Sequence, residues 1–340
     1  MATASLVKGK DRKLNVTKAL ELIIHDLGRI REKKRILIKP NLTSISNSYA
    51  NTNVEAVEAI IDFLNKEFTE PTRKEICILE GSGDAYNHQL STSEIFRKFG
   101  YYDLLSKYRN VQVKTIDQYD EFSTMPVKNI HGETRLRIAN VNRKDVYFIS
   151  LAIPKTHDIA IATLGIKNMM GLIKQEDKSL MHGVRTNTNS PNTVSNRILQ
   201  QAYSAFNGFI PNGLIYSILR PHCKYAKSVK SIHYNLLSLA KAVLPDLVVL
   251  DGLYGMEGNG PVHGDPVKLG ICVASTDPVK ADGIGVRIMG FNPEDIGYLY
   301  YAQRAGLGEY STDDLIGERI ENVKKVFRPH KDYLLQKEWR

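Results

Sequence analysis

The stretch DLVVLDGLYGMEGNGPVHGDPVKLGICVAS, residues 246–275, contains two short runs, DLVVLDG and KLGICVAS, that are apolar on both faces. Such runs are typical of parallel strands that helices cover on both sides. Similar runs occur earlier in the chain, RILIKPN at 35–41, EICILEGSG at 75–83 and DVYFISLA at 145–152. Helical patterns such as NVEAVEAIIDFLNKEF lie between them. The alternation predicts an α/β fold, a mostly parallel sheet with helices on both faces.

The composition is that of a folded globular protein. Of the 340 residues, 42% are hydrophobic and 24% charged, which is enough to bury a sizeable core. The net charge of +9 favours an anionic partner without choosing between a small compound and a macromolecule. The N-terminus lacks the apolar region of a signal peptide, and no apolar run is long enough to cross a membrane. We therefore expect a cytoplasmic protein without a transmembrane segment.

One stretch stands apart in charge. From Gly183 to Pro245 there is no Asp or Glu. The basic residues in this stretch are Arg185, Arg197, Arg220, Lys224, Lys227, Lys230 and Lys241. We expect residues 1–182 and 246–340 to form one α/β domain, and 183–245 to be a mostly helical basic insertion. Three interpretations stay open: a lid over an anionic substrate, an element that docks on nucleic acid, a ribonucleoprotein or an acidic membrane, and a solvated basic face.

Polar segments follow the apolar runs directly. They are KPN (39–41), EGSGD (80–84), PKTHD (154–158), DG (251–252) and STDP (275–278). In an open parallel sheet the ligand crevice lies outside the carboxyl ends of the strands. The sequence therefore predicts that these segments converge on one site.

The residue types at these positions suit an anionic ligand. We expect Lys39, Lys155 and Lys167 to hold the anion, and the glycine-rich loop from Asp251 to let backbone amides approach it. The substrate-binding candidates are Lys39, Asn41, Lys155, Lys167, Asn168, Asp251, Gly258 and Gly260. The candidates for proton transfer are His157, Glu80 and Glu257.

No established cofactor motif is present. GSG at 81–83 and GNG at 258–260 match neither GxGxxG nor a P-loop, and HExxH, GxSxG and EF-hand patterns do not occur. Isolated metal-ligand candidates are Glu80, His157, His182, Asp251, Glu257, His263 and Asp282. The cofactor is therefore unknown, and a divalent ion that bridges an acidic pair to a phosphate is one alternative.

The segments resemble a known family. In order they are KPN, EGSG (80–83), PKTH (154–157), IKNMMG (166–171), DGLYGMEGNGP (251–261) and STDPVKAD (275–282). Together they resemble the family called domain of unknown function 362, which is widespread in archaea and bacteria, over residues 7–310. The resemblance implies no agreed reaction. Residues 184–230 look like an insertion relative to shorter relatives.

Many members of that family are described as iron–sulfur proteins because they carry a ferredoxin-type module with clustered cysteines. This chain departs from that pattern, since Cys77, Cys223 and Cys272 lie far apart and two of them sit in apolar runs. Their spacing predicts reduced, buried thiols and no iron–sulfur cluster.

The predicted function is an enzyme that acts on a small phosphorylated or carboxylated compound at the ends of the strands. The alternative is a non-catalytic binding protein that docks through residues 183–245. A weaker third alternative, an electron-transfer partner, comes from the family description alone. The reaction, the metal and the oligomeric state stay open at this point.

Overall fold

The computed structural model describes residues 2–69, 74–129, 132–141, 144–183 and 224–340. Its main feature is a ten-stranded sheet with the order β12-β1-β11-β10-β7-β2-β3-β4. These strands are β1 (Ala4–Lys8), β2 (Arg35–Lys39), β3 (Glu75–Glu80), β4 (Val111–Thr115), β7 (Val146–Ala152), β10 (Leu247–Glu257), β11 (Asp265–Ser275) and β12 (Leu315–Gly317). The remaining two strands, β8 (Lys155–His157) and β9 (Ile161–Thr163), extend it beside β10.

Neighbouring strands from β10 to β4 run parallel, and β11 runs antiparallel to both β10 and β1. The prediction of a mostly parallel sheet is therefore confirmed. A separate antiparallel pair, β5 (Phe122–Asn129) and β6 (Gly132–Ala139), lies outside the main sheet.

Alternate residues of each central strand pack into different cores. In β2, Ile36 and Ile38 belong to one apolar cluster and Leu37 to the other. The first cluster is completed by α1 (Arg12–Leu22), α2 (Val54–Glu67), α4 (Thr92–Lys98) and α5 (Leu104–Lys107). The second is completed by α6 (Gly165–Asn168), α9 (Lys224–Ala242), α10 (Pro278–Ile288) and α11 (Gly297–Arg304).

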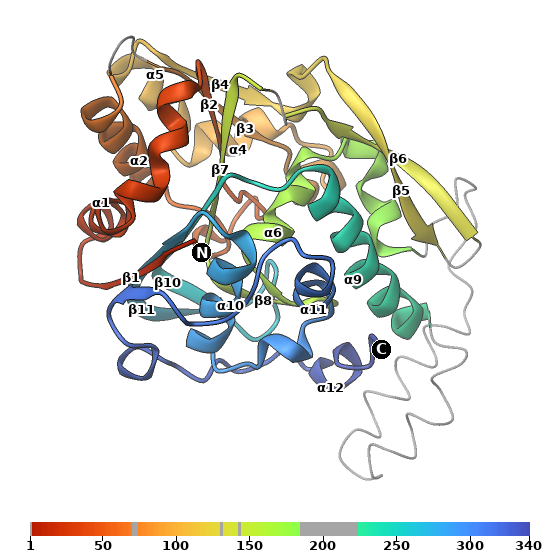
Figure 1. Ribbon diagram of the computed structural model, residues 1–340. Helices are drawn as coiled ribbons and strands as arrows, with labels where there is room; N and C mark the ends of the chain where they lie inside the picture. The colour runs from red at the N-terminus through yellow and green to blue at the C-terminus, as the bar shows by residue number, and fades with distance from the viewer. Residues whose placement is uncertain (1, 70–73, 130–131, 142–143, 184–223) are drawn as a thin grey trace.

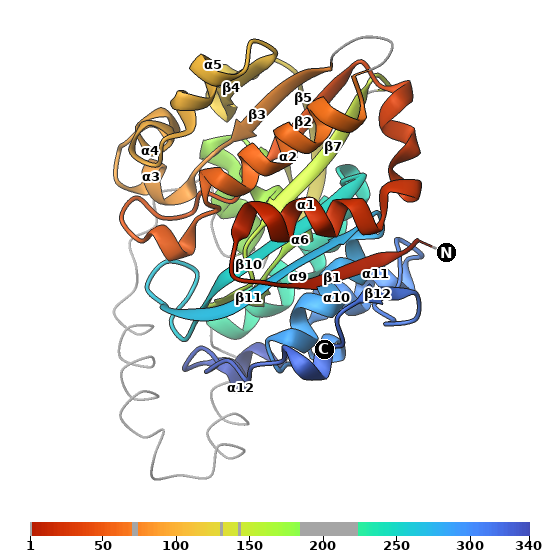
Figure 2. The same cartoon turned by 90° about the vertical axis from the view of Figure 1, so that its left-hand side faces the viewer.

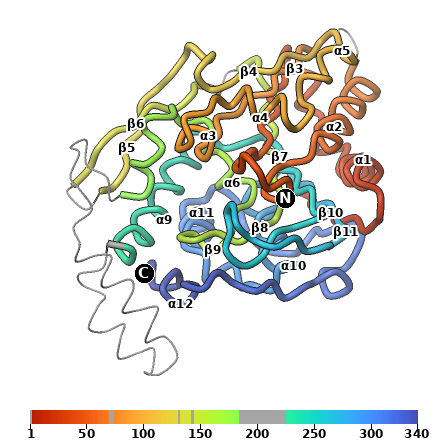
Figure 3. Tube along the Cα trace, turned by 180° about the vertical axis from the view of Figure 1, so that it is seen from behind, coloured from red at the N-terminus to blue at the C-terminus, as the bar shows by residue number. Residues whose placement is uncertain are grey.

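Figure 1 shows this sandwich, with α1 and α2 on one side of the sheet and α9 and α11 on the other. Figure 2 shows α1 and α2 lying across the face of the strands, and Figure 3 shows the same layers from behind. The doubly covered sheet explains why its strands are apolar on both faces. The remaining short helices are α3 (Gly83–Asn87) and α12 (Tyr333–Gln336).

Two helical segments are each divided into two elements. The first consists of α1, which begins after its Asp11 N-cap, and the 3₁₀ helix η1 (Ile24–Glu32). The second consists of η7 (Pro293–Asp295), which follows its Asn292 N-cap, and α11. The other 3₁₀ turns are η2 (Ser48–Ala50), η3 (Tyr101–Asp103), η4 (Ile116–Gln118), η5 (Met169–Leu172), η6 (Gln175–His182) and η8 (Ile320–Asn322).

The glycine-rich segment is not a loop from Asp251 onward, as the sequence suggested. Strand β10 continues to Glu257 and pairs with β11 as an antiparallel hairpin, with Tyr254 opposite Lys268 and Glu257 opposite Asp265. The turn of this hairpin is confined to residues 258–264, and Gly258 takes a φ of 76° there. Only this turn retains the predicted loop conformation.

The STDP segment lies at the edge of the sheet opposite to the predicted one. It follows β11, and because β11 runs against β10, its carboxyl end meets the amino ends of β7 and β10. There Asp277 caps α10 by accepting from the backbone N–H groups of Val279 and Lys280. The prediction that STDP joins the crevice is wrong.

The described part of the basic insertion is integral to the domain. Helix α9 contacts β5, η6 and α11, and Ile232, His233 and Leu236 are fully buried in it. The outer face of α9 carries the exposed Lys227, Lys230 and Lys241. The lid and docking interpretations depend chiefly on residues 184–223, which lie outside the described residues.

Candidate functional site

A pocket of about 360 Å³ lies at the carboxyl ends of β2 and β3, beside the segment that follows β7. Lys39 and Glu80 are the last residues of β2 and β3, and His157 lies in β8, shortly after β7. Three further segments cover the pocket. They contribute Lys167, Asn168 and Gly171 of α6 and η5, Lys178 and His182 of η6, and Pro261 and Val262 of the hairpin turn. The pocket is therefore at the edge of the sheet that the sequence predicted.

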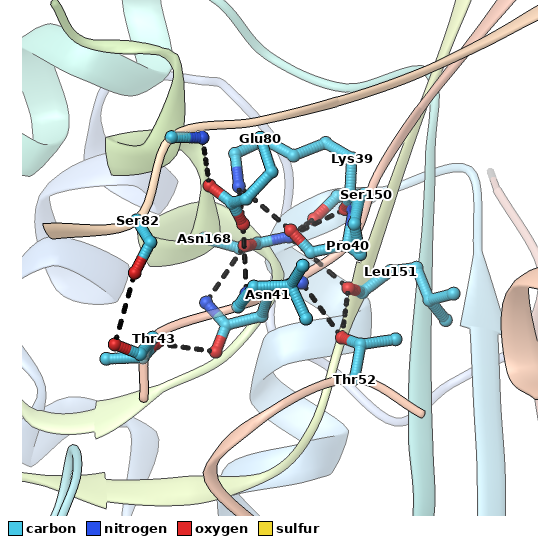
Figure 4. A network of polar contacts seen from close by, with 12 residues as sticks. Lys39, Pro40, Asn41, Thr43, Thr52, Glu80, Ser82, Ser150, Leu151 and Asn168 are labelled. Carbon is cyan, nitrogen blue, oxygen red and sulfur yellow. Dashed lines mark hydrogen bonds and ion pairs between the residues drawn. The ribbon is translucent and has the colours of Figure 1, made fainter. Parts of the chain in front are cut away.

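Lys39 and Glu80 form a buried ion pair at the base of this pocket, with 2.8 Å between Nζ and Oε2 (Figure 4). The Lys39 ammonium also donates to the Pro40 carbonyl and to Oδ1 of Asn168. Glu80 accepts from the backbone N–H groups of Leu42 and Gly81. Burial lowers the pKa of Lys39, and the Glu80 carboxylate opposes that shift. The hydrogen-bonding groups of both side chains are thus occupied by the protein.

The amides of Asn41 and Asn168 belong to the same network. Asn168 donates to the Lys39 carbonyl at 3.0 Å and to Oγ of Ser150 at 3.1 Å, and it accepts from Nδ2 of Asn41 at 3.0 Å (Figure 4). Because these groups satisfy one another, KPN, EGSG and IKNMMG build the base of the pocket. The amides of Asn41 and Asn168 are therefore engaged by the protein.

Gly171 approaches the Lys39–Glu80 pair too closely to carry a side chain. A Cβ on Gly171 would lie 2.0 Å from Oε1 of Glu80 and 2.4 Å from Nζ of Lys39.

Helix α6 is fixed by Asp282, whose carboxylate accepts from the N–H groups of Gly165 and Ile166 at 2.7 and 2.9 Å. Burial raises the pKa of Asp282 to about 7, although these two hydrogen bonds by themselves lower it. Asp282 therefore holds the backbone that carries the pocket residues.

Lys155 lies beneath the pocket and does not line it. Its buried ammonium donates to Oγ1 of Thr43 at 2.7 Å and to the Ala50 carbonyl at 2.6 Å. Burial lowers its pKa well below the usual value. Lys155 is therefore not among the residues that line the pocket, and its bonds hold the loop from Thr43 to Ala50.

The predicted site residues of β10 and its turn also lie outside the pocket lining. Asp251 is buried and pairs with Arg12, with 2.8 Å between Oδ2 and Nε, beside a separate cavity of about 220 Å³. Glu257 accepts from the backbone N–H of Arg328 at 2.8 Å. A Cβ on Gly260 would lie 2.0 Å from the Thr156 carbonyl, so this glycine permits the turn to pack on β8. Gly258 serves the turn itself through its positive φ.

His157 and His182 bring two imidazoles into the pocket. Nδ1 of His157 lies 3.1 and 3.3 Å from the N–H groups of Ile159 and Ala160. Burial lowers the pKa of His157 to about 3 and that of His182 to about 4. Oδ1 of Asp158 lies 2.9 Å from Nδ1 of His157, so it can pair with this ring once the ring takes a proton.

Two lysines complete the pocket. Lys167 is 6% exposed, and the only hydrogen-bond acceptor of its ammonium among the described residues is the Met170 sulfur, at 3.3 Å. No described carboxylate forms an ion pair with it. Lys178 donates to the Gly81 carbonyl. Burial lowers the pKa of Lys167 to about 8 and that of Lys178 to about 7.

Lys178 was missed from the sequence because QEDKSLMH has the composition of a solvated surface segment. The 3₁₀ helix η6 instead lays this segment over the end of β3. Its only signal was its position shortly after IKNMMG. Asp158 and Thr43, also at the pocket, were missed as well.

No group of three or more His, Cys, Asp or Glu side chains suited to a metal occurs in the described ranges. The metal-ligand candidates named from the sequence do not all lie in one place. Glu80, His157 and His182 line the pocket, and Asp251, Glu257, His263 and Asp282 do not. The pocket lining combines lysines, imidazoles and amides with the carboxylates of Glu80, Asp84 and Asp158.

Comparison with known proteins adds a family. The protein-family model described as "Domain of unknown function (DUF362)" matches residues 36–287 of the chain. The thylakoid-associated protein sll1697 of Synechocystis sp. (strain ATCC 27184 / PCC 6803 / Kazusa) is 37% identical over 86 residues, which are 25% of this chain and 27% of that protein. None of the described helices has the length and apolar character needed to cross a membrane.

Proposed function

The chain belongs to the family described as domain of unknown function (DUF362), and because that description carries no reaction, we propose a function from the pocket itself. The pocket binds a small anionic compound, phosphorylated or carboxylated, and the protein is an enzyme that acts on this compound. Lys167 and Lys178 attract the anion, and His157 and His182 transfer protons.

The ammonium of Lys167 is the observation that carries this proposal. The other buried lysines of the described residues have oxygen partners: Lys39 pairs with Glu80, Lys74 donates to the Arg31 carbonyl, Lys155 donates to Thr43 and Ala50, and Lys280 donates to the Ala2 carbonyl and lies 3.5 Å from Glu309. Lys167 has only a thioether sulfur as a hydrogen-bond acceptor among the described residues, and Asp158 attracts it without a direct ion pair. A buried ammonium without a contacting negative group is unfavourable, and a bound anion supplies that contact.

The imidazoles give the pocket its acid–base capacity. In the empty pocket both rings are neutral, because burial holds the pKa of His157 near 3 and that of His182 near 4. A bound anion favours the protonated ring, and Asp158 is placed to pair with His157 in that state. His157 is therefore our first candidate for general acid–base catalysis.

The remaining catalytic candidates have other roles in this proposal. Glu80 positions Lys39 and the loop at Leu42, since both its oxygens accept hydrogen bonds. Glu257 is engaged by Arg328 outside the pocket lining, and no step requires it.

Calorimetric titration tests the anion site. Inorganic phosphate and succinate are titrated separately into the wild-type protein, Lys167→Met and the control Lys324→Met, which alters an exposed lysine. A hydrogen bond to a charged group contributes about 1.5–3 kcal/mol, so Lys167→Met should weaken binding roughly 10- to 100-fold. The control should bind as the wild type does. Equal affinity in both variants, or no binding of either anion at millimolar concentration, would contradict the proposal.

A further inference from the structure

We propose that Lys167 forms a Schiff base with an aldehyde or ketone group of the ligand. The ligand class is then a small carbonyl compound that carries a carboxylate or a phosphate. This inference rests on the proposed function, because the anionic group must enter the same pocket.

The environment of Lys167 suits a nucleophilic amine. A lysine attacks a carbonyl only as the neutral amine, and at Lys167 burial favours that form more strongly than the charge of Asp158 opposes it. Lys167 is buried, and its only described hydrogen-bond contact is the Met170 sulfur, a weak acceptor. Lys39 is the opposite case, because its pair with Glu80 holds it as an ammonium.

A second cation in the pocket supports the same assignment. Lys178 donates to the Gly81 carbonyl from the adjacent η6 and lines the pocket with Lys167. One lysine can therefore attract the anionic group of the ligand while the other reacts. Burial lowers the pKa of Lys167 to about 8 and that of Lys178 to about 7, so both amines are partly neutral near neutral pH, and the hydrogen bond from Lys178 to the Gly81 carbonyl is what distinguishes them.

The other lysines are less suited to the reaction. Lys155 does not line the pocket, and its ammonium is committed to Thr43 and Ala50. Lys178 is held by the Gly81 carbonyl. Lys167 alone among these has no oxygen partner in the part of the chain that the structure describes.

The reaction is balanced without a further reactant. The Nζ lone pair attacks the carbonyl carbon and forms an N–C bond, the C=O π pair moves to oxygen, and a proton passes from nitrogen to that oxygen. The C–O bond of this carbinolamine then breaks, water departs with a second proton, and the nitrogen lone pair forms the C=N bond. His157 and His182 line the same pocket and are positioned to relay these protons. Hydrolysis by the reverse path restores the lysine.

Reductive trapping tests the inference. The wild-type protein is incubated with pyruvate or with glycolaldehyde phosphate in the presence of sodium cyanoborohydride, and the modified lysine is located by peptide mass spectrometry. We expect one adduct, on Lys167, formed at least about tenfold faster than on exposed lysines, because only neutral amines react. The probe that reacts distinguishes a carboxylate from a phosphate requirement.

Variants assign the residue. Lys167→Arg keeps the charge but cannot form an imine, so it should lose trapping while it still binds lactate or glycerol 3-phosphate, which lack a carbonyl. Lys167→Met serves if the arginine variant does not fold, with circular dichroism as the check on its fold. Lys178→Arg should retain the adduct on Lys167.

The outcomes separate the two proposals. If lactate or glycerol 3-phosphate binds in a Lys167-dependent manner but neither carbonyl probe is trapped on Lys167, the Schiff base is refuted and the anion site stands. If no anion binds at all, both proposals fail. An adduct on Lys178, or modification spread over surface lysines, also refutes the assignment to Lys167.

Discussion

The Lys39–Glu80 pair shows what a residue pattern can and cannot reveal. Their positions at the ends of two apolar runs predicted that they lie close together, and both line the pocket. The pattern could not reveal that they neutralise each other, because Lys39 and Glu80 are 41 positions apart and their pairing depends on strand order. It could not single out Lys178 either, since only the folding of η6 buries that lysine.

Glu80→Gln tests the structural role of this pair. The change leaves the buried Lys39 ammonium without its counter-charge and removes one of the oxygens that accept from Leu42 and Gly81. Breaking a buried pair in this way costs about 3–5 kcal/mol, so the free energy of unfolding should fall by that amount in urea denaturation. Glu67→Gln, in the exposed pair with Lys66, should change it by less than about 1 kcal/mol. A similar small loss in both variants would show that the Lys39–Glu80 pair is not structural.

Lys167→Met tests whether Lys167 destabilises the fold. The folded-state pKa of about 8 lies below the usual 10.5, so the unfolded chain holds a proton between these values that the folded chain has released. Lys167 should therefore contribute a rise of about 2 kcal/mol to the wild-type stability from pH 7.5 to 9.5. Lys167→Met should lose this part of the rise but keep the part due to Lys178, whose pKa burial lowers to about 7, and it should be more stable than the wild type at pH 7.5. Parallel pH dependence of the two urea midpoints would contradict the burial argument.

At the scale of elements, periodicity predicted the strands and helices well and their ends less well. Strand β10 runs past Gly252 because Tyr254, Gly255 and Met256 pair with β11, a tertiary interaction that glycine content concealed. The reversal of β11 has the same origin, since the short turn at 258–264 makes an antiparallel hairpin where parallel strands were expected. The element that positions the pocket most directly is the segment of α6 and η5, held by Asp282 and packed on the Lys39–Glu80 pair.

Gly171→Ala tests this packing. Its Cβ would overlap Oε1 of Glu80 and Nζ of Lys39, so η5 and the pair must move apart. Overpacking of this kind typically costs 1–3 kcal/mol, and we expect a loss of about that size in thermal or urea unfolding together with weakened anion binding. Gly28→Ala is the matched control, because nothing lies within 4 Å of its added Cβ and its φ is not positive. If Gly171→Ala behaves like Gly28→Ala, the close approach is not a constraint.

At the scale of the whole molecule, the α/β architecture was predictable because runs apolar on both faces require helices on both sides. The edge of the sheet that carries the pocket was predictable too, from the parallel strands β2, β3 and β7. The sequence could not predict which polar segments meet at this pocket. Asp251 lies in β10, which is parallel to β7, yet it pairs with Arg12 beside a separate cavity.

The placement of the two described cysteines argues against an iron–sulfur cluster that both of them ligate. Cys77 in β3 and Cys272 in β11 are separated by β2, β7 and β10, which at about 4.8 Å per neighbouring strand amounts to roughly 19 Å. They also pack into the two different cores, on opposite faces of the sheet.

Cluster ligands must surround one small centre, so these two thiols cannot share one. We expect protein purified anaerobically to contain neither stoichiometric iron nor acid-labile sulfide, and its absorption spectrum to lack the cluster bands, both as isolated and after incubation with iron and sulfide. Cys77→Ser and Cys272→Ser should leave those results unchanged. Stoichiometric iron and sulfide that disappear in either variant would mean that the thiols meet across two copies of the chain, and the argument from a single sheet would fail.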